Sequence, residues 1–183
     1  AAVIDLPSMG TSTAQDGDLQ ADLEAYEGML VTFADTLVIS EMFQLDRFNE
    51  IRLTEGDRPQ QFTQTNAPDV AGYAAHLEDV ASRSVIYDDG QNLQNVDIGN
   101  LDGFAGFSTA NAPNMGDTIA DLTGVLSYSW AGASASSGTY RVRSHEDGTN
   151  TFTDTNPREQ APADVGGDLK VASFNVLNFF TTI

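Results

Sequence analysis

Apolar and polar positions alternate along several short stretches of this chain, which is the pattern of half-buried β-strands. In the first of them, Met29, Val31 and Phe33 fall on one face. Residues 28–33 and 36–40 then form either two strands joined by a tight turn or one long strand with a bulge. The further strand candidates are residues 48–53, 84–87, 119–130, 138–144 and 169–180.

One helix is expected, over residues 68–83. Pro68 is preorganised for a first helical position, and Val70, Tyr73, Leu77 and Val80 form an apolar stripe at helical spacing. The mainly β order with this single helix favours an OB-fold-like five-stranded barrel, with the helix between strands three and four and an extra C-terminal strand. Composition alone does not distinguish a barrel from a sandwich.

The expected organisation has four parts. Residues 1–22 are small and polar and predict an irregular lead-in, with a short helix at 19–26 as the alternative. Residues 23–148 form the OB-fold-like domain, and residues 149–167 form a Pro/Gly linker. Residues 168–183 contain the last strand, which is the most apolar segment of the chain. The connection at 131–137 contains only small residues and is expected to be mobile.

The charge balance is strongly acidic. The chain has 27 acidic and 8 basic residues, a formal net charge of −19 and an isoelectric point near 4.1. Such a surface repels polyanions at long range, and it suits a salt-adapted source as well as an ordinary acidic protein. Cysteine is absent, which excludes disulfides and thiolate metal sites. No apolar run approaches the roughly 20 residues of a membrane span. The N-terminus also lacks the basic and apolar regions of a signal peptide, so for a secreted protein we expect the signal to have been removed or to lie upstream.

The stretch DLKVASFNVLNFFTT at 168–182, with the linker before it, resembles the junction in large bacterial extracellular nucleases. There, a linker leads into the first strand of an endonuclease/exonuclease/phosphatase domain related to pancreatic deoxyribonuclease. Four upstream pieces resemble the module that precedes this junction, which is OB-fold-like in that family. They are YEGMLVTF (26–33), VIYDDG (85–90), GDTIADLTGVLSY (116–128) and YRVR (140–143).

The resemblance implies a partial catalytic site. Asn175 matches an asparagine that lies beside the metal-binding carboxylates and the scissile phosphate, and Asn178 is a second asparagine typical of the extracellular branch. From spacing alone, an asparagine that is exposed on an edge strand or paired with backbone is the better explanation. The parent enzyme would use a divalent metal, Mg²⁺ with Ca²⁺ or Mn²⁺ as alternatives. The remaining site residues have no counterpart here, so the segment alone is expected to be inactive and to need the rest of the catalytic domain as its partner.

Several other residues are weaker candidates. Arg141 and Arg143 stand two apart in a strand and could form a basic spot for nucleic acid. Asp88 and Asp89 could bind Ca²⁺, although an Asp-Gly turn that ends a strand explains them better. Trp130 is expected in the core or at the barrel rim rather than in a base-stacking platform. The two histidines, His76 and His145, are expected at the surface.

These observations favour a non-catalytic accessory part of a secreted, extracellular bacterial nuclease that hydrolyses phosphodiester bonds in DNA, with RNA as an alternative. A structural or adhesive surface module that binds protein, polysaccharide or Ca²⁺ is the alternative from another class. Single-strand binding by the barrel is a third hypothesis, which a steep salt dependence would reveal.

Overall fold

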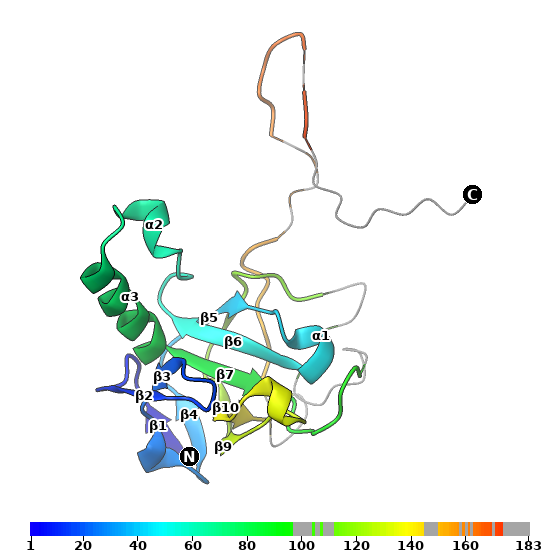
Figure 1. Cartoon of the computed structure of the whole chain (residues 1–183). Coiled ribbons are helices and arrows are strands. Elements are labelled where there is room, and N and C mark those ends of the chain that lie inside the picture. Colours follow the sequence, from blue (N-terminus) through cyan, green and yellow to red (C-terminus); the bar gives the residue numbers. More distant parts are fainter. Residues whose placement is uncertain are drawn as a thin grey trace.

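The computed structural model describes residues 1–96, 104, 107, 112–144, 150–157, 159, 161, 163–169 and 171–173. The described part is mainly β, as the sequence predicted (Figure 1). Its strands are β1 (Ala2–Ile4), β2 (Thr11–Thr13), β3 (Leu19–Ala21), β4 (Leu30–Phe33), β5 (Leu37–Glu41), β6 (Glu50–Glu55), β7 (Ser84–Asp88), β8 (Thr118–Ile119), β9 (Thr123–Ser129) and β10 (Thr139–Arg143). Its helices are α1 (Leu45–Phe48), α2 (Phe62–Thr65) and α3 (Val70–Ser82), with short 3-10 turns at Glu24–Tyr26 and Ser134–Ser136.

Eight of the described strands form one sheet in the order β1-β4-β9-β10-β7-β6-β5-β8. In this order β4 is second and β5 is seventh, yet only residues 34–36 separate them in the chain. In a flat sheet the two strands would lie about 24 Å apart, at about 4.8 Å per step. The connection from Phe33 to Leu37 reaches at most about 14 Å. The sheet must therefore curl until β4 and β5 come together, and it carries eight strands rather than the predicted five.

The inner face of the curled sheet holds the apolar core. Val31, Phe33, Leu53, Leu126 and Val142 are fully buried there. The core also includes an aromatic group of Tyr87, Phe104, Phe107 and Phe152, in which neighbouring ring centres lie 5.2–6.4 Å apart. Alternation along each strand explains the arrangement, because every second side chain points to this face.

The first 22 residues are part of the folded body rather than an irregular lead-in. Strand β1 pairs in parallel with β4, and Ile4 and Leu6 are buried. Strands β2 and β3 form an antiparallel hairpin. From β3, Gln20 accepts hydrogen bonds on Oε1 from the Thr139 hydroxyl at 2.7 Å and the Tyr140 backbone N–H at 2.9 Å. Strands of three residues carry too few alternating positions to be visible in the sequence.

Helix α3 confirms the predicted helix but not the burial of its stripe. Asp69 caps it by accepting a hydrogen bond from the Gly72 N–H. Val70 is 88% exposed, Tyr73 and Leu77 are also exposed, and only Ala81 of this helix is buried. Figure 1 shows the reason: α3 lies beside the sheet, near β2 and β3, and does not cover its inner face.

Residues 131–137 and 150–156 are more ordered than the sequence predicted. In the connection at 131–137, the buried Ser136 hydroxyl accepts from the Ala131 N–H and donates to the Ala133 carbonyl, both at 2.8 Å. Residues 150–156, expected in the linker, are held to the sheet by the Thr118–Thr153 bridge. The buried Asn150 amide also bonds to Thr123 and to the Tyr87 hydroxyl. The described residues beyond Asn156 are all exposed and contain no helix or strand.

Candidate functional site

Polar side chains gather on the face of β6, β7 and β10 that is opposite the core. Glu50 of β6 and Asp88 of β7 are direct cross-strand partners, and Asp88 is also the partner of Arg143 of β10. Their chain neighbours Ile51, Tyr87 and Val142 are buried in the core. Because successive side chains point to opposite faces, the charged residues must lie together on the other face.

Arg141 is the centre of this group. Its guanidinium is fully buried and donates from Nη1 to Glu50 Oε2 at 2.5 Å and to Asp88 Oδ2 at 3.0 Å. It also donates from Nε to the Ser129 carbonyl at 2.9 Å and from Nη2 to the Ser137 carbonyl at 3.3 Å. The carbonyls come from the two ends of the β9–β10 connection, so this connection covers the arginine. A buried guanidinium is tolerated because most of its N–H groups are bonded to carboxylates and carbonyls.

Arg143 joins the buried group to the surface. Its Nε lies 3.3 Å from Asp88 Oδ1, and its side chain is 21% exposed. Its Nη2 donates to Asn92 Oδ1 at 2.6 Å and more weakly to the carbonyls of Gln91 and Trp130. Arg143 therefore fixes the turn after β7 against the start of the β9–β10 connection.

Asn49 and Asp89 lie next to the ionic group. Asn49 is fully buried in a left-handed conformation with φ of 58°, and its Nδ2 donates to Asp89 Oδ2 at 3.3 Å. Its Oδ1 is buried and has no hydrogen-bond partner among the described residues. Burial raises the pKa of Asp89 to about 6, although the Gln91 N–H opposes the shift. Burial likewise raises the pKa of Glu50, against the effect of Arg141.

The Asp89 shift predicts a pH-dependent stability. The folded state keeps the Asp89 proton up to about pH 6, whereas the ordinary pKa is 3.8. The contribution of Asp89 to the free energy of unfolding is thus fully present below about pH 4 and is lost as the pH rises through 6. Asp89→Asn removes this loss, so the difference in stability between variant and wild type should grow in favour of the variant from pH 4 to pH 7. Urea unfolding across this range measures the difference.

The control for this experiment is Asp57→Asn, which removes the same charge from an exposed residue and corrects for the change in net charge. A difference between Asp89→Asn and wild type that stays constant with pH, after this correction, would refute the assignment.

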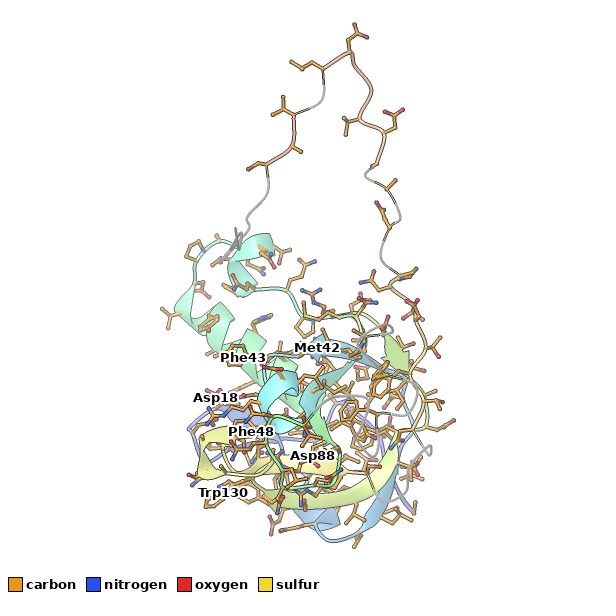
Figure 2. All side chains as sticks on the ribbon, turned by 90° about the vertical axis from the view of Figure 1, so that its right-hand side faces the viewer. Asp18, Met42, Phe43, Phe48, Asp88 and Trp130 are labelled. Carbon is orange, nitrogen blue, oxygen red and sulfur yellow. The ribbon has the colours of Figure 1, made fainter. Side chains whose placement is uncertain are left out.

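A groove opens directly beside Arg143. It has a volume of about 530 Å³ and is lined by Gln15, Asn92, Tyr128, Ser129, Trp130, Gly132, Gly138 and Arg143. Trp130 is 47% exposed and Tyr128 is 40% exposed. The Trp130 indole N–H donates to Gln15 Oε1 at 2.7 Å, which fixes the edge of the ring. Figure 2 shows Trp130 near the same end of the molecule as Asp88. This groove has the size and the mixed lining of a small-molecule site.

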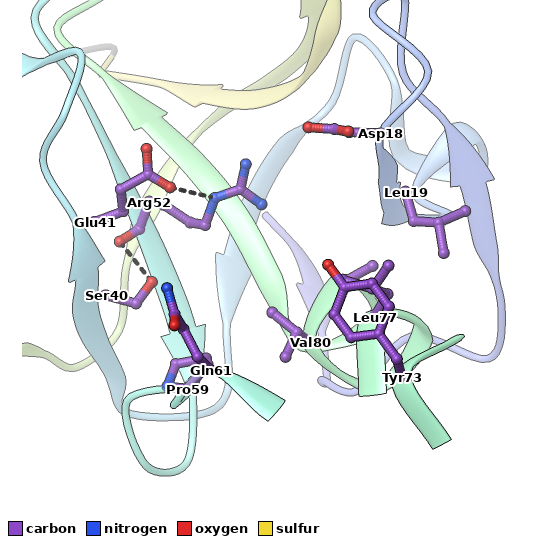
Figure 3. Close-up of a pocket in the computed structure, with 11 residues that line it drawn as sticks. Asp18, Leu19, Ser40, Glu41, Arg52, Pro59, Gln61, Tyr73, Leu77 and Val80 are labelled. Carbon is purple, nitrogen blue, oxygen red and sulfur yellow. Dashed lines mark hydrogen bonds and ion pairs between the residues drawn. The ribbon is translucent and has the colours of Figure 1, made fainter. Parts of the chain in front are cut away.

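A second hollow, of about 620 Å³, lies between α3 and the β5–β6 strands (Figure 3). The exposed apolar stripe of α3 forms one side of it. On the other side Arg52 pairs with Glu41 at 3.5 Å, and the Ser40 hydroxyl donates to the Arg52 carbonyl.

The structure brings four of the predicted site residues together, in a way that the sequence did not predict. Arg141 and Arg143, the weaker candidates for nucleic-acid contact, bind Asp88, which was a weaker candidate for Ca²⁺ than for an Asp-Gly turn. Only Arg143 reaches the surface. In the described part of the chain, no three His, Asp or Glu side chains form a group that could hold a metal ion. Asn175, Asn178 and His145 lie outside the described residues, and His76 packs beside the Phe62 ring.

Sequence reasoning missed the other half of the site. The sequence did not predict Glu50 or Asn49 as site residues, because Glu50 begins a strand in which polar and apolar residues alternate as in any half-buried strand. Gln15 lies in a segment that was expected to be irregular. The sequence of β10 contained one usable signal, because Arg141 and Arg143 lie on the same face of this strand. Where such arginines are buried in a sheet, they need carboxylates on the neighbouring strands.

Comparison with known proteins gives the family of the chain but no named function. The chain belongs to a family described as a domain of unknown function (DUF8508), whose family model matches residues 21–154. The match begins at the end of β3 and ends just after the Thr118–Thr153 bridge, so it contains β4 to β10, both arginines and Trp130. No curated protein and no solved structure matches the chain. Within the described residues, no helix has the length and apolarity that a membrane crossing requires.

Proposed function

We propose that this chain is a non-catalytic, OB-fold-like accessory module of a secreted, metal-dependent nuclease, and that it precedes the catalytic domain. The parent enzyme would hydrolyse phosphodiester bonds in extracellular DNA with Mg²⁺ or a similar divalent ion. The module would hold the catalytic domain near its target, and the rest of that domain would be its covalent partner.

The strand connectivity supports the OB-like interpretation. When β4 and β5 count as two halves of one bent strand, the ring β4/β5–β6–β7–β10–β9 has five strands and returns to β4. Its neighbours are antiparallel except β7 and β10, which are parallel. The position of α3 depends on how the strands are counted. If β4 and β5 count as two strands, then β4, β5 and β6 precede α3 and β7 follows it. If β4 and β5 count as one strand, α3 lies between strands two and three, which departs from the expected position between strands three and four.

The main support for the proposal is the exposure of the described residues that follow the barrel, beyond Asn156. Asn156 still bonds to the Met115 carbonyl and to Asp117, but the described residues from 157 to 173 are exposed throughout. Figure 1 shows their coloured segments far from the sheet. Leu169 and Val171 are more than four-fifths exposed, although they begin the most apolar segment of the sequence. Such residues need a further partner to bury them, and the resemblance of 168–182 to the first strand of a nuclease domain supplies one.

Limited proteolysis of the natural protein tests this arrangement. We expect the first cleavage between residues 157 and 167, because the described residues of this segment are exposed and belong to no helix or strand. It should release a stable module, and Mg²⁺-dependent digestion of DNA should separate with the C-terminal fragment. The proposal fails if the activity separates with the module, or if the protease cuts the barrel before the linker.

A further inference from the structure

We propose that the groove beside Arg143 binds a neutral oligosaccharide, which packs on the rings of Trp130 and Tyr128. This inference goes beyond the accessory role and does not depend on it, because the groove lies within the folded body and needs no second domain. Three observations support it: the two exposed rings, the free amide donors beside them, and the lack of net charge in the lining.

The side chains of Trp130 and Tyr128 are exposed rather than buried. Both come from the end of β9 and its connection, and nearly half of each surface is open to the groove or to solvent. The Tyr128 ring is also fixed by an edge contact with Tyr140, with ring centres 5.2 Å apart. An aromatic face has a negative quadrupole, so it attracts the weakly positive C–H faces of a sugar ring. Rings that are already fixed lose little entropy when a ligand packs on them.

The side-chain amides of Gln15 and Asn92 lie beside the two rings, and their N–H donors are available to a ligand. Gln15 Oε1 accepts from the Trp130 indole and from the Gly138 N–H at 2.9 Å, which orients the amide. Asn92 Oδ1 is likewise occupied by Arg143. The amide nitrogens of both residues make no hydrogen bond to the described residues, and each carries two donors. Sugar hydroxyl oxygens are suitable acceptors for them.

The electrostatics of the lining disfavour charged ligands. Arg143 is the one charged residue among the groove's described lining residues, and it belongs to the ionic group in which Glu50 and Asp88 face both arginines, with Asp88 3.3 Å away. Nucleic-acid binding depends on unpaired cations that neutralise phosphates, and the whole chain carries a net charge of −19. A cationic ligand would need carboxylates in the lining, which this groove lacks. The matching ligand is therefore uncharged and rich in hydroxyl groups.

The chain provides its own probe for this binding, because Trp130 is the only tryptophan in the sequence. The 183-residue protein is titrated with cellohexaose, laminarihexaose, maltohexaose and chitohexaose, and in parallel with an oligodeoxythymidylate. We expect a saturable change in tryptophan emission with at least one of the sugars, with the same affinity at low and high NaCl.

Variants then locate the site by isothermal titration calorimetry. Trp130→Ala should weaken binding of the responding sugar by about tenfold or more. Gln15→Ala should also weaken it, because this change removes the amide donors and the acceptor that orients the Trp130 indole. Tyr73→Ala is the matched control, since it removes a half-exposed aromatic ring from α3, and it should bind as wild type does. Unchanged thermal unfolding of Trp130→Ala shows that the variant is folded.

Three results would overturn the inference. The first is the absence of binding by all four sugars. The second is undiminished binding by Trp130→Ala. The third is oligodeoxythymidylate binding that depends on Trp130 and falls steeply with salt, which would make the groove a single-strand site. None of these results bears on the nuclease assignment, which is tested by proteolysis and DNA digestion.

Discussion

Replacing Arg141 with methionine is expected to lower the free energy of unfolding by about 3–5 kcal/mol. The substitution replaces the aliphatic part of the side chain but removes the guanidinium, so Glu50 and Asp88, both buried, lose the cation between them. Two carboxylates in direct cross-strand register then face each other in a medium of low polarity. Urea unfolding followed by circular dichroism measures the loss.

Two further variants separate this explanation from a general effect of losing an arginine. The double variant Arg141→Met/Glu50→Gln should recover part of the loss, because one of the two carboxylates is then neutral. Arg52→Met breaks a solvent-exposed pair with Glu41, whose side chains are 33% and 52% exposed, and should cost no more than about 1 kcal/mol. If Arg141→Met cost as little as Arg52→Met, the buried cluster would not contribute to stability as described.

Gly124→Ala is the second substitution with a large expected effect. Gly124 lies in β9, where an added methyl group would overlap the Arg143 carbonyl oxygen and lie 2.7 Å from Val142 Cγ1. Alanine normally stabilises a strand slightly by restricting the unfolded chain, by about 0.4–1 kcal/mol. Here the overlap involves backbone of the neighbouring strand, so it can be relieved only by separating β9 from β10. We expect a net loss of about 1–3 kcal/mol.

Gly10→Ala provides the control for that measurement. No heavy atom lies within 4 Å of the position of its added methyl group, and its φ is not positive. Its stability should stay within about 0.5 kcal/mol of wild type. Equal stabilities of the two variants would mean that β9 and β10 are not packed as closely as the structure shows.

The sequence predicted the larger strands well and the short ones poorly. β4, β5, β7 and β10 fall within one or two residues of their expected positions, because each alternates or is continuously apolar. The expected strand at 119–130 is divided into β8 and β9, since Asp121 adopts a positive φ of 55° between them. The stripe of α3 misled the prediction of burial: its 3.6-residue spacing identifies a helix, but not which body the helix packs on.

The candidate site could be predicted only residue by residue. Asp88, Arg141 and Arg143 each stand out in the sequence, yet β7 and β10 are separated by about 50 residues of chain. Their parallel pairing is a long-range event that local patterns do not encode. The groove depends on the same pairing, and also on Gln15 from a segment that shows no pattern at all. The partial nuclease site at Asn175 rests on resemblance alone.

Digestion of DNA by the natural protein that contains these residues, with and without Mg²⁺, is the direct test of the nuclease assignment. We predict Mg²⁺-dependent cleavage of plasmid DNA by that protein, loss of most of the activity in its Asn175→Ala variant, and no cleavage by the 183-residue chain alone. A natural protein that fails to cleave DNA, or an Asn175→Ala variant as active as wild type, would contradict the claim that this module leads into a nuclease domain.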